Sequence, residues 1–210
     1  MERRELAQII SAILLMFVVS GAAFAIQGKT VLVLQTFIFS FIVIGLPIIV
    51  KNLVAFGLDA SVEHKIWGVY HLGFRPKEHF KTEQPFGVYI PLIFSVLTLG
   101  FLKVMTFLSY ETKTLKYRAA RRFGFYSYTE MTDWHNGLIG IAGILSLFIV
   151  GIFGYVIGWE YLFKMTAYYV FWNMLPISNL DGSQIFFGSR ILWTVLGIIA
   201  LIFVLFALVI

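Results

Sequence analysis

The feature that most constrains this chain is a series of long apolar runs that are continuous rather than alternating with polar residues. The clearest runs cover residues 6–26, 31–50, 138–157, 161–177 and 191–210. A bilayer core about 30 Å thick needs ~20 mostly apolar residues for each helical crossing. Backbone groups in lipid must pair within the protein, and continuous runs favour helices over a closed barrel. We therefore predict an all-α, polytopic transmembrane helical bundle with six or seven spans.

The composition points to the lipid bilayer as the main partner. The chain is 60% hydrophobic and 13% charged, whereas a soluble domain is roughly 45–50% apolar and about 25% charged. The net charge of +5 is small and clustered, which fits a membrane surface better than nucleic acid. No aromatic-rich basic motif of a nucleic-acid binder is present, so we expect no nucleic-acid partner. The absence of cysteine excludes disulfides and thiolate metal sites.

We expect a single integral membrane domain over residues 1–210. Within it, residues 52–73 predict a polar membrane helix, because this apolar stretch also carries Asp59, Glu63, His64, Lys65 and His71. The following apolar stretch, residues 85–108, is interrupted by proline and glycine. Such an interruption is typical of a kinked helix or of a re-entrant hairpin, and the sequence leaves both open.

Residues 109–135 form the longest polar connection, and their charge predicts the orientation of the chain. Five basic residues fall within ten positions: Lys113, Lys116, Arg118, Arg121 and Arg122. Short loops rich in Lys and Arg stay on the cytoplasmic side of a membrane. We therefore expect loop 109–135 to be cytoplasmic, and the membrane to be the plasma membrane.

The strongest motif is the decamer from Asn173 to Gly182, which lies at the end of a helix predicted over residues 161–182. Asp181 within it would cost about 2.5–3.5 kcal/mol at membrane depth, so it should have a partner. Pro176 removes a backbone donor, and Gly182 permits a tight turn after the aspartate. The decamer thus predicts a helix that breaks near Pro176 and presents a carboxylate from the break. In the alternative interpretation, the helix ends at the interface and Asp181 lies in a solvated turn.

With Asn173, Pro176 and the Leu-Asp-Gly of residues 180–182 in place, this decamer resembles the signature of the site-2 protease family of intramembrane zinc metalloproteases. The segment from Gly140 to Ser146 is similar to the small-residue helix that precedes the signature in that family. The resemblance extends over most of the chain and implies the helical core of that family. It also implies a zinc ion held by the two histidines of an H-E-x-x-H motif and by the aspartate of the signature, with the glutamate as general base.

The sequence departs from the family because it contains no H-E-x-x-H motif. The nearest match, residues 60–64, has Ala60 in place of the first histidine and Ser61 in place of the base. His64 and Asp181 therefore remain as candidate metal ligands for zinc, whereas a catalytic zinc normally has three protein ligands and a water. Other side chains considered as the missing ligand are those of Asp59, Glu63 and His71.

These residues lead to three functional hypotheses. In the first, the chain is a divergent site-2 protease-like membrane protein with a degenerate catalytic centre, a pseudoprotease that binds transmembrane segments of other membrane proteins. In the second, it is an active intramembrane zinc metalloprotease with an unorthodox metal site. In the third, it is a small transporter or ion pathway, in which Asp59, Glu63, His64 and Asp181 form a polar relay.

Overall fold

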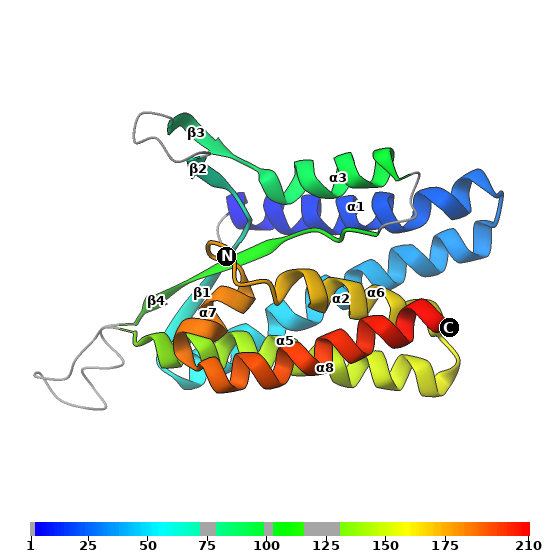
Figure 1. Cartoon of the computed structure of the whole chain (residues 1–210). Helices are drawn as coiled ribbons and strands as arrows, with labels where there is room; N and C mark the ends of the chain where they lie inside the picture. Colours follow the sequence, from blue (N-terminus) through cyan, green and yellow to red (C-terminus); the bar gives the residue numbers. More distant parts are fainter. Residues whose placement is uncertain (1–2, 72–78, 99–102, 116–130) are drawn as a thin grey trace, which may run out of the picture.

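A computed structural model of the chain describes residues 3–71, 79–98, 103–115 and 131–210, and most of these residues are helical (Figure 1). The helices are α1 (Arg3–Ile26), α2 (Thr30–Gly57), α3 (Phe86–Leu97), α5 (Asp133–Ile157), α6 (Glu160–Asn173), α7 (Asp181–Gly188) and α8 (Arg190–Val209). The strands are β1 (Ala60–Ile66), β2 (Val69–His71), β3 (His79–Gln84) and β4 (Leu108–Thr114). β1 pairs with β4, and β2 pairs with β3, in two separate antiparallel sheets.

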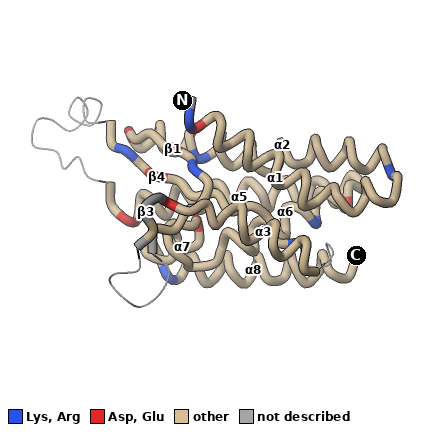
Figure 2. The backbone as a smooth tube through the Cα atoms, turned by 90° about the horizontal axis from the view of Figure 1, so that it is seen from above, with Lys and Arg blue, Asp and Glu red and all other residues tan. Residues whose placement is uncertain are grey.

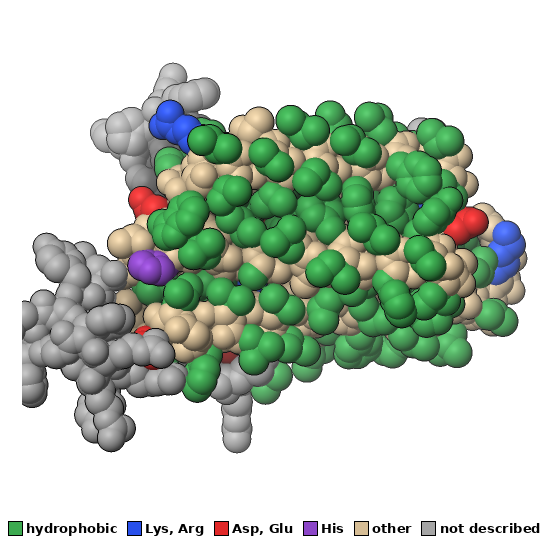
Figure 3. All heavy atoms as spheres, turned by 90° about the horizontal axis from the view of Figure 1, so that it is seen from below, with side chains coloured by type: hydrophobic (Ala, Val, Ile, Leu, Met, Phe, Trp, Pro, Cys, Tyr) green, Lys and Arg blue, Asp and Glu red, His purple; other side chains and the backbone are tan. Residues whose placement is uncertain are grey.

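Four of the helices, α1, α2, α5 and α8, are long and apolar enough to cross a membrane. All four helices expose large apolar side chains, and such side chains cover much of the face shown in Figure 3. These observations indicate a membrane-embedded helical protein. The 12 residues of α3 and the 14 residues of α6 extend only about 18 and 21 Å. The expected number of six or seven spans therefore stays a prediction.

The two ends of the bundle differ in the elements that they contain. The start of α1, the strands and α7 lie at one end, whereas the α1–α2 turn, the α5–α6 turn and the C-terminus lie at the other (Figure 1). Charged residues gather toward the two ends, and long stretches of the helices between them carry none (Figure 2). Of loop 109–135, residues 116–130 lie outside the described part of the chain. Its first residues belong to β4, at the same end as the start of α1.

The predicted polar membrane helix over residues 52–73 is wrong. α2 continues to Gly57, and the chain then turns through Asp59, which has a φ of 55°. The next seven residues form β1, in which Val62 and His64 are buried and Glu63 faces the other side. This alternation has the period of two that a half-buried strand requires. The partner strand comes from residues 108–114, so the sequence of residues 52–73 alone does not reveal the pairing.

The described part of residues 85–108 is a helix, α3, followed by an extended segment over residues 103–107, so it is not one kinked helix. α3 runs away from the strand end, and residues 103–107 return beside α1 toward β4 (Figure 1). In the returning segment Val104, Met105 and Thr106 are fully buried. Non-helical backbone at membrane depth is tolerated where protein surrounds it, and this segment meets that condition.

Candidate functional site: a buried lysine–aspartate pair beside a polar pocket

The predicted helix over residues 161–182 is interrupted, as the decamer suggested, but earlier than expected. α6 ends at Asn173, three residues before Pro176, and α7 begins at Asp181. Asp181 is only 2% exposed, so the alternative of a solvated turn is wrong. The break itself is exposed over residues 176–179, whereas its last residue, Leu180, is buried and bridges to Ser109.

Gly182 serves close packing rather than a tight turn. It is the second residue of α7, and a Cβ atom at this position would lie 2.1 Å from the carbonyl oxygen of Met174. The start of α7 can therefore rest against the end of α6 only because residue 182 has no side chain. This contact fixes the position of the neighbouring Asp181.

The partner of Asp181 is Lys51, which sequence reasoning did not single out. The Lys51 Nζ atom donates to Asp181 Oδ2 over 2.6 Å, and both side chains are 4% exposed. Lys51 comes from α2, where it follows a long apolar run. A charged residue in such a run is the signal that could have identified it, because intramembrane charges usually have a functional partner.

Two neighbours enclose the Lys51 side chain. Its stem passes Gly143 of α5, where a Cβ atom would lie 2.5 Å from Lys51 Cε. Its ammonium group lies 4.5 Å from the centroid of the Tyr110 ring, a favourable cation–π distance. Gly143 is ten residues from the polar start of α5 at Asp133, about 15 Å along the helix. The stem of Lys51 therefore contacts α5 well inside the bundle, away from the polar end of that helix.

Asn173 links the end of α6 to the returning extended segment. Its amide nitrogen donates to the carbonyl oxygens of Tyr169, over 2.9 Å, and of Thr106, over 3.4 Å. Its side-chain oxygen and Asp181 Oδ1 are both buried and find no hydrogen-bond partner among the described residues. Buried polar atoms of this kind normally bind water or an ion. Buried polar atoms therefore lie on both sides of the break, at Asn173 before it and at Asp181 after it.

His64 of β1 lies directly opposite Tyr110 of β4 in the antiparallel register. It is 2% exposed, and neither ring nitrogen has a hydrogen-bond partner among the described residues. Burial, and then the positive charge of Lys51, lower the pKa of His64 to about 3. Its Nδ1 atom is 3.6 Å from Glu5 Oε1, but a neutral imidazole forms no ion pair. Glu5 instead accepts the backbone N–H of His64 over 3.1 Å.

The other candidate ligands do not converge on His64 and Asp181. Glu63 points to the opposite face of β1, where Lys113 Nζ donates to it over 2.6 Å. Asp59 is buried at the turn before β1, and its carbonyl oxygen accepts the N–H of Leu115. His71 belongs to the separate β2–β3 sheet, and its side chain lies outside the described part.

The residues present do not fit the zinc ion that the resemblance implies. A catalytic zinc needs three protein ligands and an open position. Within the described ranges, no three His, Cys, Asp or Glu side chains gather closely enough to hold a metal ion. The carboxylate that should bind zinc already faces the ammonium group of Lys51.

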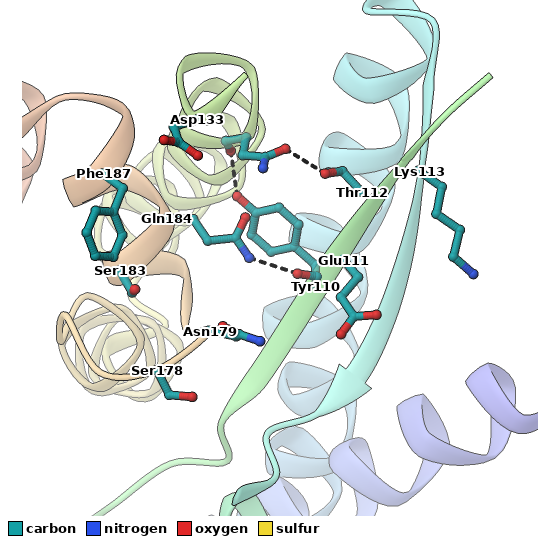
Figure 4. A pocket seen from close by; sticks show the side chains of 11 residues that line it. Tyr110, Glu111, Thr112, Lys113, Asp133, Ser178, Asn179, Ser183, Gln184 and Phe187 are labelled. Carbon is teal, nitrogen blue, oxygen red and sulfur yellow. Dashed lines mark hydrogen bonds between the residues drawn. The ribbon is translucent and has the colours of Figure 1, made fainter. Parts of the chain in front are cut away.

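A polar pocket of about 460 Å³ lies beside this centre (Figure 4). Its walls are β4, the start of α5, the α6–α7 connection and α7, and they include Tyr110, Thr112, Asn136, Asn179, Ser183 and Gln184. Tyr110 donates its hydroxyl to the Asn136 carbonyl oxygen over 2.6 Å, and Gln184 Nε2 donates to the Tyr110 carbonyl oxygen over 2.8 Å. Because Tyr110 also contacts Lys51, its ring stands between the pocket and the buried pair.

Comparison with protein-family models, with characterised proteins and with solved structures found no match to this chain.

Proposed function

We propose that this protein is a divergent relative of the site-2 protease family that lacks catalytic activity and binds extended segments of other membrane proteins. The observation that carries the proposal is the polar pocket, which lies along the outer edge of β4 and beside the break that presents Asp181. The family relation rests on the decamer from Asn173 to Gly182 and on the small-residue segment from Gly140 to Ser146.

Two features support the loss of catalysis. The chain has no H-E-x-x-H motif, and a general base must reach the metal-bound water to activate it. Glu63 lies on the opposite face of β1 from His64 and pairs with Lys113. It is therefore unable to replace the missing base at a site that contains His64 and Asp181.

The hydrogen-bonding pattern of β4 supports the binding of an extended segment. Phe107 accepts from Trp67, and Leu115 donates to Asp59, so the odd-numbered residues of β4 direct their backbone groups toward β1. In an antiparallel strand the intervening residues face the other way. Tyr110 follows this rule, because its carbonyl oxygen accepts from Gln184 on the outer side.

Thr112 is the residue at which a second chain could pair. By the same alternation its backbone N–H and C=O point outward, next to the pocket, and no backbone partner from another described segment faces them. An extended peptide adds to such an edge through main-chain hydrogen bonds, and pockets beside the edge select its side chains. The amides of Asn136, Asn179 and Gln184 would favour polar side chains close to the helix break of an unwound transmembrane segment.

The test is peptide binding to purified protein in nanodiscs. The probe is a fluorescent transmembrane peptide of Leu and Ala with a central Asn-Pro-Gly break, and the same peptide without the break is the control. We expect saturable binding of the broken peptide only. Thr112→Pro should weaken it about tenfold, because it removes the outward N–H and one or two hydrogen bonds. Thr112→Val keeps the backbone donor and loses only the side-chain hydrogen bond to Asn136 Oδ1, so it should bind more tightly than Thr112→Pro. Equal affinity of all three proteins would contradict the proposal.

Incubation of the same peptide with and without zinc separates the other two hypotheses. We expect no cleavage. Cleavage that a chelator stops, and that His64→Ala and Asp181→Ala abolish, would establish the unorthodox metalloprotease instead. Ion flux into liposomes that Asp181→Asn abolishes would support the ion pathway.

A further inference from the structure

We propose that Lys51 is a built-in cation that takes the place of a metal ion, so that the centre around Asp181 is assembled without metal. This inference does not rest on the proposed function. It concerns how the buried carboxylate is held, and it follows from the disagreement between the zinc that the resemblance implies and the residues that are present.

The ammonium group is placed where it neutralises the carboxylate. Lys51 Nζ is 2.6 Å from Asp181 Oδ2, within the range of a short charge-assisted hydrogen bond. Both groups are almost completely buried, and a buried ion is tolerated only when an opposite charge compensates it. A metal ion held by Asp181 would perform the same neutralisation.

A second cation at this carboxylate would be repelled. Like charges repel strongly at short range inside a protein, and a divalent ion doubles the repulsion of a monovalent one. His64, the other candidate ligand, offers no compensating negative charge, because an imidazole is neutral or positively charged in its two ordinary protonation states. The described surroundings therefore favour one cation, the lysine, over a lysine and a metal ion together.

The pair also joins α2 to α7, and α7 is one wall of the pocket. Lys51 belongs to α2, and Asp181 is the first residue of α7, whose next residue packs on the carbonyl group of Met174. Ser178, Asn179 and Ser183, which line the pocket, lie within three residues of Asp181. By fixing Asp181, Lys51 fixes this wall of the pocket. The tether spans 130 residues of sequence, as a metal ion bound from two helices would.

The first experiment measures metal in the wild-type protein, which avoids any question of folding. Detergent-purified protein is incubated with zinc, passed over a desalting column and analysed by mass spectrometry, and its thermal midpoint is measured with zinc and with EDTA. We expect no stoichiometric zinc and the same midpoint in both conditions. One zinc ion per chain, lost in Asp181→Asn, would overturn the proposal.

The second experiment is a double-mutant cycle of Lys51→Met and Asp181→Asn, followed by unfolding. Lys51→Met alone should lower the folding equilibrium constant by roughly a hundredfold or more, because it leaves a buried carboxylate uncompensated. In the Asp181→Asn background the same change should cost less than about tenfold, since no charge remains to be neutralised. Lys103→Met is the matched control, because Lys103 contacts the rings of Phe24 and Tyr161 rather than a carboxylate.

Equal losses in the two backgrounds would overturn the proposal, because they would assign Lys51 a packing role only. If Lys51→Met fails to fold, recovery of folded protein in the double variant supports the proposal. Failure of both, with Asp181→Asn folded, refutes it. Neither experiment uses a peptide, so its outcome is independent of the binding test above.

Discussion

Replacement of Gly182 by alanine should destabilise the protein strongly, and the structure sets the size of the effect. The new Cβ atom would lie 2.1 Å from the Met174 carbonyl oxygen and 2.8 Å from that of Leu175. Ordinary contacts begin at 3.4 Å, so α7 and the end of α6 must separate by about 1.3 Å at this point. Both obstacles are backbone atoms, which cannot rotate away as a flexible side chain would.

The separation would also reach the buried ion pair. Asp181 adjoins Gly182, and its 2.6 Å contact with Lys51 becomes too long for a hydrogen bond if the carboxylate moves by a similar amount. Overpacking costs about 1–3 kcal/mol, and breaking a buried pair costs about 3–5 kcal/mol. Because the structure can relax in part, we expect the free energy of unfolding to fall by about 3–6 kcal/mol. The thermal midpoint should therefore fall by about 6–24 °C, since 1 kcal/mol shifts a chain of this size by ~2–4 °C.

The assay is thermal unfolding in detergent, followed by tryptophan fluorescence. Gly197→Ala in α8 is the matched control, because a Cβ atom there meets nothing within 4 Å. Alanine is favoured over glycine in a helix by about 1 kcal/mol, so this variant should match or exceed the wild type. If Gly182→Ala unfolds at the wild-type midpoint, the close approach of α7 to Met174 is not the constraint that we describe.

Two further predictions concern pH and orientation. The pKa of His64 is about 3 in the folded protein, against 6.5 as the ordinary value, so the unfolded chain binds the proton more readily between these two values. The contribution of His64 to the free energy of unfolding is then fully present above about pH 6.5, and about 2 kcal/mol of it should be lost at pH 5. Denaturant unfolding should show this loss in the wild type and in His135→Leu but not in His64→Leu. An unchanged pH dependence in His64→Leu would contradict the assignment. The chain has no cysteine, so single cysteines can be introduced at Gln27 and at Thr114. They should react with an impermeant reagent from opposite sides of the membrane, and the cysteine at position 114 should react from the cytoplasmic side. Reaction of both from one side would refute the arrangement.

The sequence alone indicated a helical membrane-embedded protein and the break in the Asp181 segment. Long apolar runs leave a backbone in lipid with few ways to satisfy its hydrogen bonds other than helices, so this inference needed no tertiary information. The combination of Pro176, Asp181 and Gly182 likewise restricts the local backbone. It predicted the interruption, although α6 ends earlier, at Asn173.

Only the tertiary structure decided what faces the aspartate and which segments are strands. Residues 60–66 are too few for their periodicity to separate a strand from a helix, and the choice depends on β4, which pairs with them from almost fifty residues away. Lys51 and Asp181 are 130 positions apart, and no local pattern in the sequence relates them. Burial makes each charge depend on the other, because an unpaired charge inside the bundle would cost several kcal/mol. The chain's own packing, rather than a short motif, therefore determines how this centre is neutralised.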